Sequence, residues 1–210
     1  MDEYSLKLDK FLMPLVSNIK NPIILELGVE NGRSTKKFLD ICSNKYGKVF
    51  SVDVNDCSSV TNDKNWKFFK TRDDNFEFIK SKLPEKIDVL FIDSLHEASH
   101  VEKLIYAYYP IIKVGGYIFV DDISHLPYLK DKKRNNFYCE INNKETFKTI
   151  ISIYSGNTDK FDLSFTFYSS GLGIIKKNSN DDLTKKIELA ERSISLKNIL
   201  RRVWRQLKRN

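Results

Sequence analysis

The most constraining feature of this sequence is a repeated alternation of short apolar runs with stretches of helical periodicity. Four of the runs are typical of strands buried on both faces of a sheet. They are Ile23 to Leu27, Val49 to Val54, Val89 to Ile92 and Tyr117 to Val120. The helical patterns between them are Ser34 to Ile41, Asn75 to Leu83 and Glu97 to Ile112. This order predicts a doubly wound α/β fold whose ligand lies beyond the carboxyl ends of parallel strands.

The rest of the chain extends this sheet. Trp66 to Thr71 is a weaker strand candidate, and Lys144 to Tyr154 has the pattern of another helix. Two further strands, Phe161 to Tyr168 and Leu172 to Ile175, flank a Ser-Ser-Gly turn and predict an antiparallel hairpin. The complete prediction is one Rossmann-like α/β domain with a seven-stranded sheet that ends in this hairpin.

Two helices are expected to flank the sheet segments. Apolar residues recur near helical spacing over residues 5–19, before Asn21-Pro22 ends the pattern. We therefore assign residues 1–180 to the α/β domain, with a leading helix over 5–19. Residues 181–210 are expected to form a basic, amphipathic C-terminal helix.

The net charge of +7 is concentrated in that C-terminal segment. Between Lys197 and Arg209 the chain has six cationic residues and no acidic one. The segment could pack on its own domain or on a second copy, giving a homo-oligomer. An anionic membrane surface is the next alternative, because Trp204 and the apolar face could enter the lipid interface. Nucleic acid is the third and least favoured partner.

The composition also bears on location. No apolar run approaches the roughly 18 residues of a membrane span, and the N-terminus lacks the pattern of a secretory signal. Cys42, Cys57 and Cys139 fit neither a disulfide framework nor a metal motif. We expect a cytoplasmic protein, with peripheral membrane attachment through the basic segment as an addition.

The first apolar run leads into a glycine-containing loop, Gly28-Val29-Glu30-Asn31-Gly32. Such a loop between strand and helix predicts a cofactor site, and Asp53 at the end of the second strand could accept hydrogen bonds from the hydroxyls of a ribose. A dinucleotide site would have a third glycine where Glu30 stands. The carboxylates of Glu26 and Glu30 are unfavourable beside a diphosphate but suit a cofactor with an ammonium and a sulfonium. These residues favour S-adenosylmethionine over NAD.

This loop resembles motif I of the class I S-adenosylmethionine-dependent methyltransferases. The form Glu-x-Gly-Val-x-x-Gly-x-Ser is similar to that of the macrocin and mycinamicin sugar O-methyltransferases and the cephalosporin hydroxylase-like proteins, which are of the methyltransferase family 24 type. The likeness covers about Ile23 to Asp122. It implies contacts of the motif residues and Asp93 with the cofactor, Asp53 at the ribose, and Asp73 or Asp74 near the adenine. The implied motif residues are Glu26, Gly28, Gly32 and Ser34.

Acidic residues also follow the later strands. Asp93 ends one strand and Asp121-Asp122 the next, so three carboxylates and His96 should meet at one edge of the sheet. Clustered carboxylates need a proton or a cation between them, and an all-oxygen set suits Mg²⁺ or Mn²⁺. The resemblance likewise implies Asp93, Asp121 and Asp122 as metal ligands and His96 as the base. Ser94 departs from the family pattern, which has a glycine there.

Structural interpretations of the same residues stay open. Acidic residues at strand ends often only cap the next helix. His100 could partner His96 or be a solvated or core histidine, and His125 could reach a substrate. Acceptor specificity is expected in loops such as Leu126 to Asn143, which have no readable code.

Together these features predict transfer of a methyl group from S-adenosylmethionine to a hydroxyl of a sugar, glycoside or related small molecule, assisted by a divalent cation. The alternatives are another acceptor, such as a phenol or a nucleic acid, or a non-catalytic scaffold that keeps the cofactor fold. The absence of an evident Lys-Asp-Lys-Glu set counts against methylation of a nucleic-acid ribose.

Overall fold

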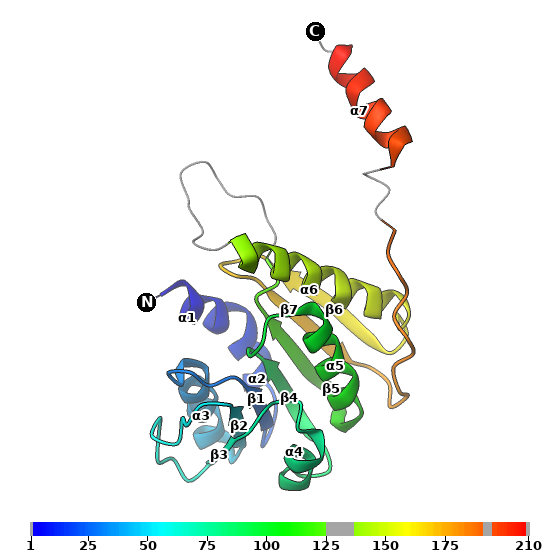
Figure 1. Ribbon diagram of the computed structural model, residues 1–210. Helices are drawn as coiled ribbons and strands as arrows, with labels where there is room; N and C mark the ends of the chain where they lie inside the picture. Colours follow the sequence, from blue (N-terminus) through cyan, green and yellow to red (C-terminus); the bar gives the residue numbers. More distant parts are fainter. Residues whose placement is uncertain (1, 125–136, 191–194, 209–210) are drawn as a thin grey trace.

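The computed structural model describes residues 2–124, 137–190 and 195–208, apart from the side chains of 137–140. A seven-stranded sheet crosses the molecule in the order β3-β2-β1-β4-β5-β7-β6 (Figure 1). The strands are β1 Ile23–Leu27, β2 Lys48–Asp53, β3 Trp66–Lys70, β4 Ile87–Ile92, β5 Ile112–Asp121, β6 Phe161–Thr166 and β7 Leu172–Lys177. Strands β1 to β5 run parallel, and β7 is antiparallel to both of its neighbours. This confirms the predicted α/β fold with its terminal hairpin.

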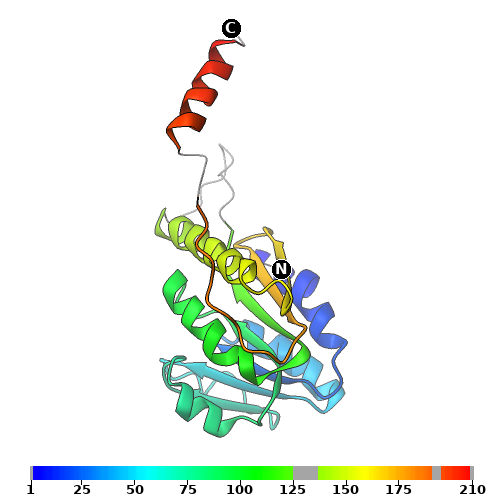
Figure 2. The ribbon, with the colours of Figure 1, turned by 90° about the vertical axis from the view of Figure 1, so that its right-hand side faces the viewer.

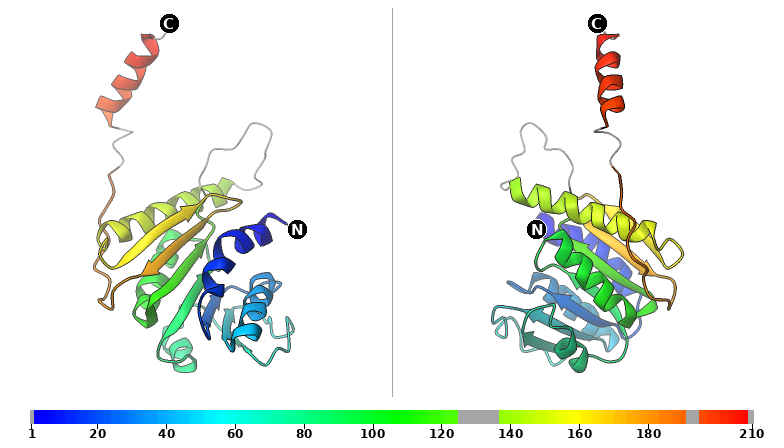
Figure 3. Two further views of the ribbon diagram at one scale, coloured as in Figure 1. Left: turned by 180° about the vertical axis from the view of Figure 1, so that it is seen from behind. Right: turned by 45° about the vertical axis from the view of Figure 1, so that its right-hand side comes forward.

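Helices cover both faces of the sheet (Figures 1 and 3). One face carries the N-terminal helical segment and α3, and the other carries α4, α5 and α6. These elements are α1 Glu3–Lys7, the π-helical η1 Leu8–Leu12, α2 Met13–Ser17, α3 Arg33–Lys45, α4 Phe76–Lys82, α5 Ala98–Tyr108 with the short 3-10 turn η2 Tyr109–Ile111, and α6 Phe137–Ser155.

The buried core divides into two layers along the sheet. Successive residues of a strand point to opposite faces, so Ile24 belongs to the layer under α3 whereas Leu25 and Leu27 belong to the layer under α4 and α5. Each of these three side chains is fully buried. Burial on both faces explains why the central strands have continuous apolar sequences and do not alternate.

The two flanking helices differ from their predicted forms. The segment predicted as one helix over 5–19 contains a π-helical turn, and α2 ends at Ser17. Of the C-terminal segment predicted as helical over 181–210, the described helix is α7, Leu196–Leu207. Residues 183–190 are extended because their backbone binds to the domain: Asn157 accepts from the N–H of Thr184, and Ser152 from that of Ile187.

Helix α7 lies apart from the domain, beyond the extended segment (Figure 2). None of its residues is buried. Within the described part of the chain, no helix is both long and apolar enough to cross a membrane.

Candidate active site

The site lies where the chain changes direction across the sheet, between the adjacent strands β1 and β4. Gly28 follows β1 with a backbone φ of +95°, and a Cβ there would lie 2.0 Å from the carbonyl oxygen of Asp93. Both facts require glycine, because a side chain would clash and would strain the backbone. The loops after β1 and β4 can therefore meet closely at this switch point, where doubly wound sheets bind their ligands.

Asp53 fixes the loop that follows β1. Its Oδ2 accepts the backbone N–H of Val29 at 2.9 Å and that of Glu30 at 3.2 Å, and its Oδ1 accepts the N–H of Asn55 at 2.8 Å. Burial raises the pKa of Asp53, but these three N–H groups outweigh burial and hold the pKa below its ordinary value. The ionised carboxylate keeps one of about four acceptor positions for a ligand, fewer than the sequence-based prediction assumed.

Glu26 lies beneath the loop. It is fully buried and accepts hydrogen bonds from three hydroxyls: Ser34 at 2.5 Å, and Thr35 and Ser51 at 2.6 Å each. Burial raises the pKa of Glu26, and the hydroxyl donors oppose that rise. The predicted contact of Glu26 with the cofactor is not supported, because Glu26 lines neither cavity described below. It connects β1, β2 and α3 under the loop.

One cavity, of about 390 Å³, lies between the loops after β1, β2 and β4. Asp53 and Asp73 line it together with the apolar side chains of Val29, Val54 and Leu95. Asp73 accepts from Ser94 and lies 2.9 Å from Nε2 of His100. The two predicted adenine-side acids differ in position, since Asp73 lines the cavity whereas Asp74 does not and pairs with Arg72 and Lys103.

A second cavity, of about 370 Å³, adjoins the first and shares Gly28, Val29, Glu30 and Asp93 with it. It is lined by polar side chains from α1, α3, the end of β5 and the loops after β1, β4 and β5. They include Tyr4, Arg33, Ser34, Asp93, His96, Asp121 and Asp122. Gly32 lines neither cavity; it begins α3 in the left-handed conformation, with φ +69°.

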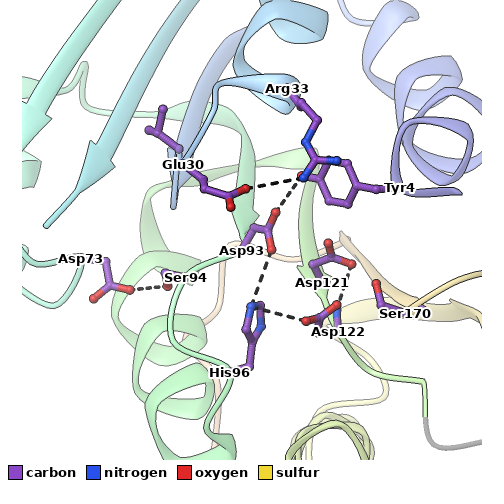
Figure 4. A network of polar contacts seen from close by, with 12 residues as sticks. Tyr4, Glu30, Arg33, Asp73, Asp93, Ser94, His96, Asp121, Asp122 and Ser170 are labelled. Carbon is purple, nitrogen blue, oxygen red and sulfur yellow. Dashed lines mark hydrogen bonds and ion pairs between the residues drawn. The ribbon is translucent and has the colours of Figure 1, made fainter. Parts of the chain in front are cut away.

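His96 lies between two of the predicted carboxylates (Figure 4). Its Nε2 is 3.5 Å from Oδ2 of Asp122 and 3.8 Å from Oδ1 of Asp93. The His96 side chain is 33% exposed, so it remains accessible from the cavity. This placement matches the prediction from the sequence, which put His96 in one pocket with Asp93 and the Asp121-Asp122 pair.

The three carboxylates do not converge on a common ligand point. Asp121 accepts a hydrogen bond from the Lys7 ammonium, and Asp93 accepts one from the Tyr4 hydroxyl at 2.7 Å. Among the described residues, no group of three or more His, Cys, Asp or Glu side chains is arranged to hold a metal ion. Two of the predicted metal ligands, Asp93 and Asp121, are instead hydrogen-bonded to residues of the N-terminal helix, and the metal role of Asp93, Asp121 and Asp122 stays a prediction.

Burial governs the protonation of these acids. It raises the pKa of Asp93 to about 6, which the Tyr4 hydrogen bond opposes and the nearby Asp122 carboxylate reinforces. Burial, followed by the Asp93 carboxylate, also raises the pKa of Asp121, while Lys7 opposes that rise. At least one carboxyl of the cavity can therefore exchange a proton near neutral pH.

Sequence reasoning missed the contributions of Tyr4, Lys7 and Arg33 to this cavity. A signal was present: Lys7 lies three residues after Tyr4 and four before Phe11, so it falls on the apolar face of the leading helix. His100 is a buried histidine that forms a hydrogen bond with Asp73 and does not pair with His96. His125 and residues 126–136 of the predicted specificity loop lie outside the described residues.

The fold, the glycine loop at the switch point and the paired cavities agree with those expected from the sequence for an S-adenosylmethionine-dependent methyltransferase. Residues 25–123 match the family model described as a methyltransferase domain. A comparison with curated proteins gives no match.

Several solved methyltransferases share the fold. One is MycE from the mycinamycin biosynthetic pathway, solved with magnesium and S-adenosylhomocysteine. It is 18% identical to this chain, with a TM-score of 0.57, and the match covers 77% of this chain and 46% of MycE. The Podospora anserina methyltransferase PaMTH1, bound to S-adenosylhomocysteine, is 14% identical with a TM-score of 0.63 over 80% and 76%.

CalS11, a TDP-rhamnose 3'-O-methyltransferase of calicheamicin biosynthesis, is 13% identical with a TM-score of 0.56 over 82% and 78% of the two chains. At such identities the likeness establishes a common fold. The present chain spans about half the length of MycE, which is 46% covered.

Proposed function

We propose that this protein transfers a methyl group from S-adenosylmethionine to a hydroxyl oxygen of a sugar, glycoside or related small molecule. The observation that carries the proposal is the position of His96, which faces a polar cavity directly beside the cavity suited to an adenosine. A proton acceptor next to a methyl donor site is what O-methylation requires. The fold shared with MycE of mycinamycin biosynthesis and with CalS11, a TDP-rhamnose 3'-O-methyltransferase, is consistent with such an acceptor.

The residues around the first cavity fit the cofactor. Asp53 retains an acceptor position for a ribose hydroxyl, and Val54 and Leu95 offer apolar contact to a base. In the second cavity Arg33 supplies a cation for the carboxylate of the methionine portion. When bound, S-adenosylmethionine supplies an electrophilic methyl group. The shared lining of Gly28 and Asp93 would bring that end of the cofactor to the boundary of the two cavities.

His96 would then act on the acceptor. A neutral imidazole removes the proton of the acceptor hydroxyl, and the carboxylates of Asp93 and Asp122 stabilise the imidazolium that forms. The remaining requirement is alignment of the oxygen with the methyl group, which the walls of the cavity provide.

The residues as arranged do not fit the Mg²⁺ or Mn²⁺ that was predicted from the sequence. Asp121 is bound by an ammonium, and the hydroxyl of Tyr4 donates to Asp93, so one oxygen of each acid already has a hydrogen-bond donor. The proposed reaction therefore involves no divalent cation.

The test is a methyl-transfer assay with radiolabelled S-adenosylmethionine on a panel of nucleotide sugars, glycosides and phenols. We expect turnover of a sugar or glycoside, and a fall of roughly a hundredfold or more in kcat for His96→Ala, the scale for losing a general base. Glu97→Gln, an exposed neighbouring change, is the matched control and should leave kcat unchanged.

Other outcomes would identify the alternatives. Turnover of phenols only, or of RNA, would replace the proposed acceptor class. Cofactor binding without transfer to any acceptor would favour the non-catalytic scaffold. An unchanged kcat in His96→Ala would remove His96 from its proposed role.

A further inference from the structure

A buried cation lies behind the acidic cavity and binds one of the carboxylates that line it. Lys7 is fully buried, and its ammonium donates to Oδ1 of Asp121, to Oγ of Ser170 at 2.6 Å and to the carbonyl oxygen of Gly171 at 3.4 Å. Three acceptors match the three N–H groups of an ammonium. Lys7 is thus held as a fixed charge and has no further N–H group for a substrate.

The position of this charge matters because Lys7 binds the Asp121 carboxylate directly and also lowers the pKa of Asp93. The Asp121 side chain is 1% exposed, and a buried carboxylate requires a paired charge. Oδ1 of Asp121 also accepts the backbone N–H of Asp122 at 2.8 Å, and Asp122 has a left-handed backbone with φ +57°. Lys7 therefore acts through Asp121 on the turn that presents Asp122 to His96.

A divalent cation at Asp121 would compete with this arrangement. It would compete with Lys7 for Oδ1 of Asp121, and even at the other oxygen it would lie beside a buried ammonium of the same sign. Tyr4, one helical turn before Lys7, donates to Asp93 in the same way, so the N-terminal helix covers both acids.

We propose that Lys7 is the built-in counter-cation of this cavity, and that it takes the place of a divalent metal ion. Lys7 is a positioning residue, which keeps Asp121 and Asp122 in place without contacting the acceptor. For catalysis the proposal implies methyl transfer without a metal ion, and this consequence rests on the proposed function. The exclusion of a metal ion from the cavity does not depend on that function.

The experiment is a calorimetric titration of the full chain with MnCl₂ alone, with no cofactor or acceptor. The wild-type protein is expected to bind no stoichiometric Mn²⁺. Lys7→Ala frees Asp121 and should bind one Mn²⁺ per chain, at least tenfold more tightly than the wild type, as judged also by the electron paramagnetic resonance signal of free Mn²⁺. Lys7→Ala combined with Asp121→Asn should lose that binding again.

Lys10→Ala is the matched control, since it removes an exposed lysine from the same helical segment and should bind no Mn²⁺. Stoichiometric Mn²⁺ binding by the wild type would overturn the proposal, whether or not the variants fold. A folded Lys7→Ala protein that binds no Mn²⁺ would also overturn it. Neither result depends on methyl transfer, so failure here is distinct from failure of the proposed function.

A second inference comes from helix α7, which is independent of the cavity. Its apolar side chains recur along one face and remain 45–75% exposed, whereas cationic residues occupy the rest of its surface. The apolar residues are Leu196, Ile199, Leu200, Val203, Trp204 and Leu207. The cationic residues are Lys197, Arg201, Arg202, Arg205 and Lys208.

We infer that α7 docks on an anionic lipid surface. The chain has no acidic residue after Glu191, so two α7 helices packed together would bring like charges close. Nucleic acid would engage the cations but leave the apolar face in water. A lipid interface satisfies both faces, since the apolar side chains enter it, Trp204 lies at its edge and the cations meet anionic head groups.

The test is cosedimentation of the full chain with vesicles of phosphatidylcholine, with and without phosphatidylglycerol. We expect binding only with the anionic lipid, weakened by added salt, and a blue shift of tryptophan emission. Leu200→Glu should reduce binding at least tenfold, whereas Asn198→Glu, the same charge change on the opposite face, should reduce it less. No binding to anionic vesicles, equal loss in both variants, concentration-dependent dimers through α7, or preference for RNA would each overturn the inference.

Discussion

At the scale of single residues, this site depends on the hydrogen-bond and charge partners of its carboxylates. Asp93 accepts from the Tyr4 hydroxyl, Asp121 accepts from the Lys7 ammonium, and Asp122 lies beside His96. Burial raises the pKa of both Asp93 and Asp121. Asp93 has a hydroxyl donor and no direct cation, and its pKa of about 6 allows it to take up a proton as the pH falls below neutral.

The first prediction concerns the pH dependence of Asp93. Its pKa in the folded protein is raised to about 6, above the ordinary value for the unfolded chain. The stability that Asp93 contributes is thus complete below the unfolded pKa and is lost as the pH rises through about 6. The free energy of unfolding of the wild type relative to Asp93→Asn should fall by about 2 kcal/mol between roughly pH 4 and pH 7, allowing for partial exposure.

Urea unfolding of both proteins across this range is the measurement. Subtracting the variant removes contributions from other titrating groups. A difference that stays constant with pH, or rises with it, would show that Asp93 is ionised throughout.

Residue identity alone predicted part of this arrangement. Strand-end acids followed by His96 placed these groups at one edge of the sheet, because parallel strands end together. The partners of the acids could not be read in the same way. Lys7 lies 114 residues from Asp121, and Tyr4 lies 89 residues from Asp93, so only the tertiary fold brings them into contact.

At the scale of elements, the loop after β1 shows how a motif can support a site without touching a ligand. The sequence motif assigned Glu26 to the cofactor, but its carboxylate is directed at hydroxyls of α3 and β2. The motif fixed the loop's position correctly, since Gly28 lines both cavities. It could not show in which direction a buried strand residue points.

We predict that Glu26→Ala destabilises the fold by about 2–4 kcal/mol, because it leaves three buried hydroxyls without their acceptor. Glu26→Gln should cost less, since its amide oxygen can still accept. Thermal unfolding monitored by circular dichroism is the measurement. A stable Glu26→Ala protein that has lost cofactor affinity would restore Glu26 to the ligand site.

The secondary-structure elements also differ in how well the sequence predicts them. Strands and sheet-covering helices were predictable from periodicity, because burial on the sheet imposes it. The extended path of residues 183–190 was not, since it depends on backbone hydrogen bonds to Asn157 and Ser152, which have no local signature.

At the scale of the whole molecule, the described active-site residues and α7 are separate in sequence. Every described residue of both cavities lies between Tyr4 and Asp122. We predict that deletion of residues 197–210 leaves S-adenosylhomocysteine affinity within about twofold of the full chain, because no contact of the cavities is lost. Calorimetry on the truncated protein tests this, and a lost affinity would make α7 part of the catalytic fold.

We propose that S-adenosylmethionine binds at the β1–β4 switch point. Calorimetric titration with S-adenosylhomocysteine tests this, comparing the wild type with Asp53→Ala and with Asp56→Ala, a control change of an exposed acid in the same loop. We expect one molecule bound per chain, weakened by about 1–3 kcal/mol in Asp53→Ala and unaffected in Asp56→Ala. No binding by the wild type, or equal affinity in Asp53→Ala, would contradict it.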